Sequence, residues 1–189
     1  MPELRLHSLI ERTSANGPGI RACVWVQGCT LACVGCFNPM THERSLDHGS
    51  DVVSLAQRLC AIDGIEGVTM SGGEPLQQPQ AVLDLARLLR ATSSLSLIIF
   101  TGYDQSELQR MPCYAELVQL CDVIIAGRYR DGERVAAGLI GSANKHLIIC
   151  SDRYTLADFV AVPPSEVVIM DDGSIVATGI NPLPYEVYV

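Results

Sequence analysis

The sequence predicts an α/β fold: a mainly parallel sheet with helices outside it, as a partial (incomplete) β/α barrel or an open sheet, in a single domain over residues 1–189. Two observations predict this fold. Short apolar segments typical of strands alternate with segments of helical periodicity, which is the pattern of repeated β-α units. The length of 189 residues is short for a closed eight-fold barrel, which takes about 250 residues. In either arrangement we expect functional groups at the carboxyl ends of the strands.

The expected strands are short and rich in β-branched and other apolar residues. They cover residues 21–27, 68–70, 95–100, 121–126 and 146–150. The first four run into glycine-containing turns, at Gly28, Ser71-Gly72-Gly73, Thr101-Gly102 and Gly127. Near the carboxyl end, residues 167–170 and 175–178 flank Asp171-Asp172-Gly173, which favours a hairpin turn.

Four helices are expected, over residues 51–61, 80–90, 114–120 and 155–160. The first has apolar residues at a helical period, at Val52, Leu55, Ala56 and Leu59. Ser50 or Asp51 is placed to cap its amino end. Pro79 fits the first turn of the second helix, since a backbone N–H has no helical partner there.

Composition and charge exclude several classes of protein. Apolar residues make up 48% and charged residues 18%, which excludes general disorder. The net charge of −8, from 13 Lys+Arg and 21 Asp+Glu, argues against binding of nucleic-acid phosphates. No apolar run reaches the roughly 18 residues of a membrane helix. Charges spread through residues 1–7 argue against a secretory signal, so we expect a cytoplasmic protein with no nucleic-acid or membrane partner.

The eight cysteines are too few for a disulfide scaffold, so metal or redox chemistry is the better explanation. Cys29, Cys33 and Cys36 form a C-x3-C-x2-C motif in a turn-rich loop after a predicted strand. Cys23 precedes the motif on a strand of opposite facing and is left out of it. The other cysteines are expected to be buried, inert thiols beside apolar stretches. They are Cys60, Cys113, Cys121 and Cys150.

Three thiolates in one loop can hold one metal centre, and such soft ligands favour zinc or an iron–sulfur cluster. A structural zinc ion takes four ligands, and Cys23, His42 or His48 would have to supply the fourth. A four-iron, four-sulfur cluster normally takes four cysteines. With three cysteines, one iron stays open for an outside ligand, and the cluster becomes a site of reaction.

A second motif, Ser71-Gly72-Gly73-Glu74-Pro75, follows about 35 residues after the third cysteine of the motif, at the end of a predicted strand. Adjacent glycines permit unusual backbone angles and a close approach of the backbone to a ligand. By itself such a turn is more typical of an ordinary loop, so its meaning depends on the cysteine motif.

The cysteine motif followed by the aromatic Phe37 resembles the signature of the radical S-adenosylmethionine enzymes. The resemblance implies that Cys29, Cys33 and Cys36 bind a four-iron, four-sulfur (4Fe-4S) cluster whose open iron chelates the amine and carboxylate of S-adenosylmethionine. It also implies that the backbone of Gly72-Gly73-Glu74 binds the amino group of this cosubstrate and that Phe37 packs near its adenine. No catalytic side chain is expected beyond the cluster and the cosubstrate.

A series of further motifs is similar to the activating proteins of anaerobic ribonucleoside-triphosphate reductase, close kin of pyruvate formate-lyase activating enzyme. In chain order the motifs are Gly17-Pro18-Gly19-Ile20-Arg21, Gln27-Gly28-Cys29, Asn38-Pro39, Phe100-Thr101-Gly102-Tyr103, Asp122-Val123-Ile124-Ile125 with Gly127-Arg128, and Gly141-Ser142-Ala143-Asn144. The resemblance covers roughly residues 10–180. Four residues depart from the family pattern and bear on the identity of the partner. They are Asn16 (commonly Asp), Phe37 (often His), Ala126 (often acidic) and Lys145 (Gln in a Ser-x-Asn-Gln pattern).

The resemblance implies a set of cosubstrate-binding residues. They are Gly35, Phe37, Asn38, Gly72, Gly73, Glu74, Thr101, Arg128, Ser142 and Asn144. Arg128 is expected to contact the cosubstrate carboxylate, with an exposed loop arginine as the alternative. Ser142 and Asn144 are expected to bond the ribose or methionine, with a local turn cap as the alternative.

Three functions compete. In the first, the protein is an activase that removes the α-hydrogen of one glycine in a glycyl-radical enzyme. The electron would come from a flavodoxin or ferredoxin. A short, laterally open barrel would admit a loop of the partner protein. In the second, the same chemistry acts on a small molecule or peptide, as in 7-carboxy-7-deazaguanine synthase, whose relatives usually show Cys-Asp-Thr where this chain shows Phe37-Asn38-Pro39. In the third, the protein is a zinc or iron–sulfur interaction module and not an enzyme.

Overall fold

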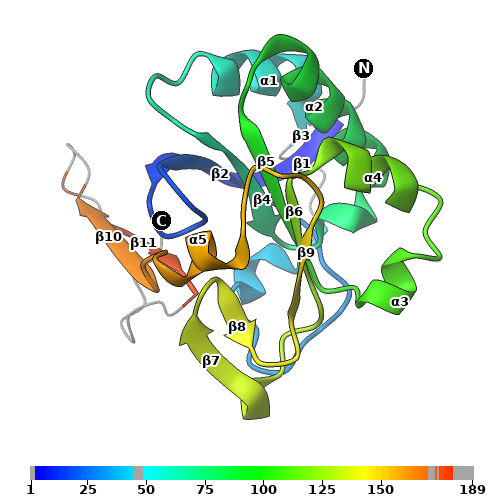
Figure 1. Cartoon of the computed structure of the whole chain (residues 1–189), viewed down its shortest axis with the longest axis vertical. Helices are drawn as coiled ribbons and strands as arrows, with labels where there is room; N and C mark the ends of the chain where they lie inside the picture. Colours follow the sequence, from blue (N-terminus) through cyan, green and yellow to red (C-terminus); the bar gives the residue numbers. More distant parts are fainter. Residues whose placement is uncertain (1–2, 45–48, 170–172, 174, 181–189) are drawn as a thin grey trace.

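The computed structural model describes residues 3–44, 49–169, 173 and 175–180. Its largest sheet has seven strands (Figure 1). They are β1 (Glu3–Thr13), β2 (Arg21–Val26), β3 (Gly49–Asp51), β4 (Gly67–Gly72), β5 (Ser96–Thr101), β6 (Val123–Ala126) and β9 (His146–Ile149). Their order across the sheet is β3-β1-β2-β4-β5-β6-β9.

The centre of this sheet is parallel, from β2 through β4 and β5 to β6. At its edges β1 pairs antiparallel with β2 and β3, and β9 pairs antiparallel with β6. All five strands predicted for the sheet are present, with β4 longer and β6 shorter than expected. The predicted α/β class with a parallel core is therefore confirmed. Over the described ranges the edge strands β3 and β9 do not pair with each other.

The strand β1 is absent from the predicted set. Its first half alternates charged residues with leucines, and such alternation is the two-residue period of a half-buried strand. Leu4 is fully buried, and Leu6 and Leu9 pack against the same core. The charges that argue against a signal sequence therefore alternate with the buried side chains of a strand that lies between β3 and β2.

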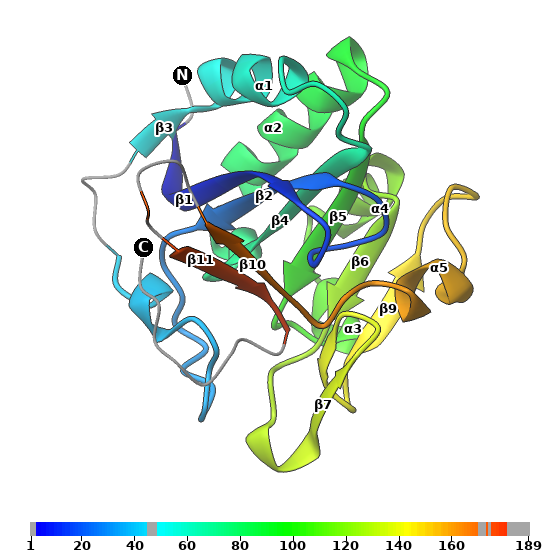
Figure 2. The same cartoon turned by 90° about the vertical axis from the view of Figure 1, so that its left-hand side faces the viewer.

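Three helices cover one face of the sheet (Figures 1 and 2). They are α1 (Val52–Cys60), α2 (Pro79–Thr92) and α4 (Tyr114–Leu120). Asp51 caps α1, because its carboxylate accepts a hydrogen bond of 2.8 Å from the backbone N–H of Ser54. The inward side chains of these helices and of β2 form the larger core, which includes Val24, Leu85 and Leu89. None of the helices described is both long enough and apolar enough to cross a membrane.

Smaller elements cover the opposite face (Figure 2). They are α5 (Leu156–Val160), the hairpin of β7 (Arg134–Ala137) and β8 (Ile140–Ser142), and the hairpin of β10 (Ser165–Ile169) and β11 (Ile175–Gly179). Ile98 of β5 and Ile125 of β6 form the second core with Leu139 and Phe159. The β10–β11 hairpin confirms the predicted pairing, with Val167 opposite Ala177. Asp171 and Asp172 of its predicted turn lie outside the described residues.

Short turns of helix connect the remaining segments. They are α3 (Gln105–Leu108), η1 (Pro39–Thr41), η2 (Pro75–Gln77) and η3 (Asp131–Glu133). In α3 the side chain of Asp104 accepts from the Glu107 N–H at 2.9 Å, and the Glu107 side chain accepts from the Asp104 N–H at 2.9 Å. Such a reciprocal pair satisfies two backbone donors that a helix start leaves free.

Arg21 is buried beneath the covering elements. Its guanidinium donates hydrogen bonds to Thr69 Oγ1 at 2.9 Å, Ser96 Oγ at 2.7 Å and the Tyr154 hydroxyl at 3.0 Å. A Cβ on Gly17 would lie 2.5 Å from Cδ of Arg21, so only glycine lets the chain pass over this side chain. The Gly17-Pro18-Gly19 motif thus has a structural role, which is to wrap the chain around a buried arginine.

Candidate functional site

A pocket lies where the carboxyl ends of β2, β4 and β5 meet, as predicted for functional groups in this fold. From the strands it is lined by Trp25, Ser71, Gly72, Phe100 and Thr101. The loops after these strands contribute Cys29, Leu31, Cys33, Cys36, Phe37, Asn38, His42, Gly73, Glu74 and Gly102. The remaining wall includes Tyr129, Leu139, Gly141, Lys145, Gly179 and Ile180.

The base of the cysteine loop is fixed by hydrogen bonds. The N–H of Gly28 donates to the Thr41 carbonyl at 2.8 Å, and that of Cys29 donates to the His42 carbonyl at 3.2 Å. The buried side chain of Gln27 donates to the carbonyls of Met40 at 3.2 Å and Glu43 at 2.7 Å. The two ends of the loop therefore stay together, and the cysteines project from a closed base.

The three motif cysteines are half-buried and line the same pocket. Burial raises the pKa of Cys29 and of Cys36, and the neighbouring motif cysteines add to this rise in both cases. A metal must displace the thiol protons when it binds, and binding is then coupled to proton release. The arrangement fits a metal centre that is bound by three thiolates of a single loop.

Among the residues described, no group of three Cys, His, Asp or Glu side chains is close enough to ligate a single metal ion. Cys23, one of the possible fourth ligands of a zinc ion, is fully buried on β2 and does not line the pocket. His48 lies outside the described residues. The cysteines of a cluster bind different irons, so they need not approach one another as closely as the ligands of one ion.

Three buried side-chain polar atoms have no hydrogen-bond partner in the described part of the chain. They are Nε of Arg5, Nε2 of His42, in the pocket wall, and Oδ1 of Asn144. Buried polar atoms without a partner are uncommon and call for a ligand or an ion. The thiols and the free imidazole nitrogen thus fit a bound iron–sulfur cluster.

The glycine turn is joined to the cysteine loop through its backbone. The N–H of Gly73 donates to the Val26 carbonyl at 2.8 Å, and the N–H of Glu74 donates to the Gly28 carbonyl at 3.0 Å. Gly72 has φ 93°, which favours glycine. Both glycines are therefore required by the close approach of the two segments.

Glu74 is 1% exposed, and both of its carboxylate oxygens are occupied. Oε1 accepts from Thr101 Oγ1 and from the Leu76 N–H, each at 2.9 Å, and Oε2 accepts from the Gly102 N–H at 2.7 Å. Burial raises the pKa of Glu74, and these hydrogen bonds oppose the rise. The carboxylate ties the end of β4 to the end of β5, so Glu74 and Thr101 fix the shape of the pocket.

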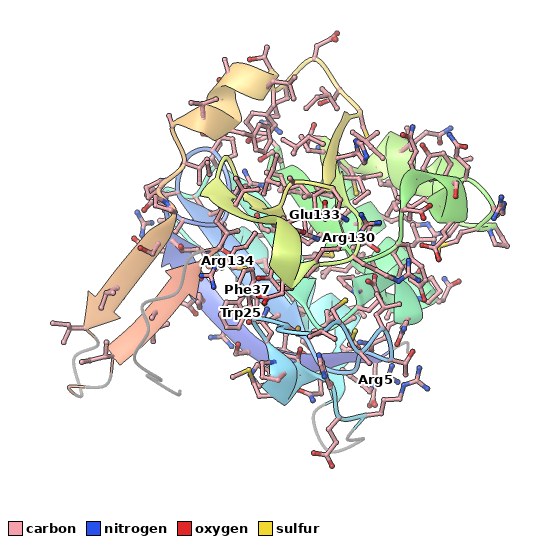
Figure 3. All side chains as sticks on the ribbon, turned by 90° about the horizontal axis from the view of Figure 1, so that it is seen from below. Arg5, Trp25, Phe37, Arg130, Glu133 and Arg134 are labelled. Carbon is pink, nitrogen blue, oxygen red and sulfur yellow. The ribbon has the colours of Figure 1, made fainter. Side chains whose placement is uncertain are left out.

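Phe37 is packed under the β7–β8 hairpin (Figure 3). Its ring lies 4.5 Å from the ring of Tyr129, centroid to centroid, and 5.3 Å from the Arg134 guanidinium carbon. A Cβ on Gly141 would lie 2.9 Å from its ring, so glycine makes room for the phenyl group. Phe37 is therefore both a pocket wall and the anchor of the hairpin.

Arg128, the residue expected to contact the cosubstrate carboxylate, does not line the pocket. Its guanidinium forms two hydrogen bonds to Glu107, at 2.5 Å and 2.8 Å. Lys145 lines the pocket instead, and its Nζ donates to the Gly127 carbonyl at 2.5 Å. Burial lowers the pKa of Lys145, and the neighbouring Cys33, Glu74 and Cys36 oppose this. The one sign of Lys145 in the sequence is its departure from the Ser-x-Asn-Gln pattern.

Other expected residues divide into two sets. Those that the pocket brings together are Cys29, Cys33, Cys36, Phe37, Asn38, Gly72, Gly73, Glu74 and Thr101. Those outside its lining are Gly35, Arg128, Ser142 and Asn144. Ser142 Oγ accepts from the Arg130 N–H at 3.2 Å, and Asn144 Nδ2 donates to the Arg128 carbonyl at 2.9 Å, as local turn contacts do. Trp25, His42 and Tyr129 are pocket residues that the motifs do not single out.

The remaining cysteines differ in exposure. Cys23 and Cys121 are buried, and burial raises the pKa of Cys23 to about 12. Cys113 and Cys150 are half-buried. Cys60 is exposed at the end of α1, so the expectation of a buried thiol is wrong there. Its apolar neighbours belong to the inward side of the helix, whereas position 60 lies on the outer side.

The fold and the pocket together define a class of iron–sulfur protein. The family model described as "4Fe-4S single cluster domain" matches residues 15–148, which include the cysteine loop, the glycine turn and the four parallel strands. The chain therefore belongs to this family.

The chain is also similar in sequence to individual proteins of known name. The anaerobic ribonucleoside-triphosphate reductase-activating protein of Enterobacteria phage T4 is 30% identical over 138 residues, which are 70% of this chain and 85% of the relative. The pyruvate formate-lyase-activating enzyme of Clostridium pasteurianum is 31% identical over 121 residues, 61% of this chain and 51% of the relative. The chain thus spans about half the length of the clostridial relative. The reductase-activating protein of Salmonella typhimurium is 28% identical over 136 residues, 67% of this chain and 85% of the relative. These matches confirm the family resemblance that the motifs predict.

Proposed function

We propose that this protein is a radical S-adenosylmethionine activase that generates a glycyl radical on a partner enzyme. The observation that carries the proposal is the junction of two motifs: the cysteine loop and the Gly72-Gly73 turn share one pocket and are joined by backbone hydrogen bonds at Val26 and Gly28. A ligand held by the cysteines and a ligand held by the turn would therefore be in contact.

Cys29, Cys33 and Cys36 would hold the 4Fe-4S cluster and leave one iron open. When bound, the cluster supplies the electron that cleaves the sulfonium bond of S-adenosylmethionine. The raised pKa of Cys29 and Cys36 means that these thiols keep their protons in the metal-free protein and lose them on loading. His42 would donate its free Nε2–H to the bound group.

The cosubstrate would lie between the glycine turn and the Phe37 wall. The backbone of Gly72 and Gly73 would bind its amino group, because no side chain blocks the approach. Glu74 and Thr101 would hold this backbone in place through their mutual hydrogen bond. Phe37 and Asn38 would bound the adenine side.

The expected residues that do not line the pocket would support the backbone of the segments that do. Gly35 has φ 69°, and a Cβ there would lie 2.9 Å from Oδ1 of Asp131, so glycine lets the loop turn between the last two cysteines. Asn144 holds the Arg128 backbone, and Ser142 holds that of Arg130. These contacts would fix the segment that carries Tyr129 into the pocket.

The partner would be a glycyl-radical enzyme, as the name of one relative, the putative glycyl-radical enzyme activating enzyme of Haemophilus influenzae, indicates for that protein. A glycine-bearing loop would enter the pocket past Leu139 and Ile180, which belong to the smaller elements that cover this face. A flavodoxin or ferredoxin would supply the electron.

The experiment is an anaerobic reconstitution with iron and sulfide, followed by reduction and mixing with S-adenosylmethionine and a candidate glycyl-radical enzyme. We expect about four irons per chain, formation of methionine, and a glycyl doublet in the electron paramagnetic resonance spectrum of the partner. Cys33→Ala should lose all three signals. Methionine formation coupled to consumption of a small metabolite, with no glycyl doublet on any glycyl-radical enzyme of the source organism, would refute the activase proposal. Zinc without iron would refute the cluster.

A further inference from the structure

Lys145 is held in the pocket by the pairing of two strands. β9 begins at His146, which is opposite Ala126 of β6, so Lys145 comes next to Gly127. The N–H of Gly127 donates to the carbonyls of Thr101 at 3.1 Å and Tyr103 at 2.9 Å. The Gly127 carbonyl that accepts from Lys145 Nζ is therefore fixed to the end of β5, and the ammonium group is fixed with it.

The charge of Lys145 has no carboxylate partner within the described ranges, where it makes no ion pair. The nearby carboxylate, Glu74, is occupied by three donors from other residues. The other groups that act electrostatically on Lys145 are the thiols of Cys33 and Cys36. The ammonium group thus lines the pocket with two of the three motif cysteines and has no ion-pair partner in the described part of the chain, although the buried Glu74 also acts on its charge.

Arg128 provides the contrast. It also acts electrostatically on Cys33, but its charge is balanced by Glu107 through two hydrogen bonds. Ala126, which pairs with His146 beside Lys145, is buried and does not line the pocket, so of these two departures from the family pattern only Lys145 adds charge to the pocket wall.

We propose that Lys145 is a positioning residue that sets the reduction potential of the cluster bound by Cys29, Cys33 and Cys36. The inference rests on the proposed function, because it requires the cluster. One electron enters the site from the external donor, and the site becomes more negative by one charge. A fixed positive charge beside it favours this reduced state, and net charge and surroundings are known to set cluster potentials.

The test is a redox titration of the reconstituted protein, followed by electron paramagnetic resonance, without cosubstrate or partner. Lys145→Gln should keep its iron and show a more negative midpoint potential. We expect about a tenfold lower ratio of reduced to oxidised cluster at a fixed potential, which is about 59 mV for one electron. Lys145→Arg keeps the charge and should titrate close to the unaltered protein. Arg87→Gln removes a positive charge from α2, on the helix-covered face, and should not shift the potential.

Lys145→Met covers the case in which Lys145→Gln loses its iron, because it also removes the charge and keeps a long side chain. Its midpoint potential should be more negative, as in Lys145→Gln. An unchanged potential in either variant when it holds iron, or an equal shift in Lys145→Arg, would overturn the role of Lys145. Loss of iron from both uncharged variants would also overturn it, since Lys145 would then hold the cluster and not set its potential. Because the titration needs neither S-adenosylmethionine nor a partner, its failure leaves the activase proposal standing, and failure of glycyl-radical formation leaves the titration interpretable.

Discussion

The α-carbon of Gly73 faces the carbonyl oxygen of Gly28 so closely that a Cβ on residue 73 would lie 2.5 Å from that oxygen. This contact is the point at which the glycine turn meets the cysteine loop. It explains why position 73 needs glycine, whereas Gly28 is favoured by its own φ of 101°. The strongest prediction about the site follows from it.

Gly73→Ala should separate the two motifs. The added methyl group must displace the Gly28 carbonyl, which breaks the hydrogen bond from the Glu74 N–H. We expect a loss of about 1–3 kcal/mol in the free energy of unfolding and a large loss of S-adenosylmethionine binding. Thermal unfolding and calorimetric titration of the reconstituted protein measure the two effects.

Gly132→Ala is the matched control for this variant, because a Cβ on Gly132 meets nothing within 4 Å. It should bind the cosubstrate as the unaltered protein does. Equal affinity in Gly73→Ala and Gly132→Ala would show that the turn does not form the cosubstrate site.

Each motif cysteine should be required for the cluster. Replacement of Cys29, Cys33 or Cys36 by Ala removes one of three thiolates, and we expect iron content after reconstitution to fall to background. Cys60→Ala removes an exposed thiol from α1 and should leave iron content unchanged. Iron analysis with the brown absorbance of the cluster decides this, and full iron in Cys33→Ala would contradict the assignment.

Thiol labelling should separate the cysteines by burial. In the native metal-free protein, iodoacetamide should modify Cys60 readily, whereas Cys23 and Cys121 should react only after unfolding. Both are buried, and burial raises the pKa of Cys23 to about 12, so its reactive thiolate is scarce. Reconstitution should protect the three motif cysteines and leave Cys60 exposed. Mass spectrometry of labelled peptides reads each site, and rapid native labelling of Cys23 would be inconsistent with the fold.

Asp122 should stabilise the fold in a pH-dependent way. Its carboxylate accepts from Arg90 and from the Leu97 N–H at 2.7 Å each, and from Ser151 at 2.6 Å. Burial alone would raise the pKa of Asp122, but these hydrogen bonds outweigh it and lower the pKa below 3.8. The stabilisation is therefore complete above the unfolded-state pKa and disappears as the pH falls through the lower native value.

Asp122→Asn should therefore lose about 3 kcal/mol near neutral pH, since it breaks a largely buried ion pair. The difference from the unaltered protein should shrink as the pH falls below 3.8. Urea unfolding over this range measures it, with Asp84→Asn on α2 as the control. A difference that does not change with pH would exclude a role for the negative charge.

The sequence was sufficient to predict the alternating units, a helix cap at Ser50 or Asp51 and the position of the pocket, because these follow from local periodicity and from the geometry of parallel strands. The structure shows that Asp51 is the cap. It did not predict β1. The alternation of charged residues and leucines near the amino end was taken only as evidence against a signal sequence, but it is also the two-residue period of a strand. The sequence placed Arg128 in the site and not Lys145, because a motif cannot show that Glu107 occupies the arginine. The roles of Trp25 and Tyr129 depend on segments that come together only in the folded chain.

The contact between the amino-terminal segment and the β10–β11 hairpin affects how the protein matures. Asn16 and Ile180 face the same pocket, and Asn16 Nδ2 donates to Thr178 Oγ1 at 2.7 Å. Thr13 Oγ1 donates to Glu166 Oε2 at 2.6 Å, which joins the same distant segments. Translation must therefore reach residue 180 before the wall is complete, and iron delivered to a nascent chain would meet the thiols in a pocket whose wall is still unfinished.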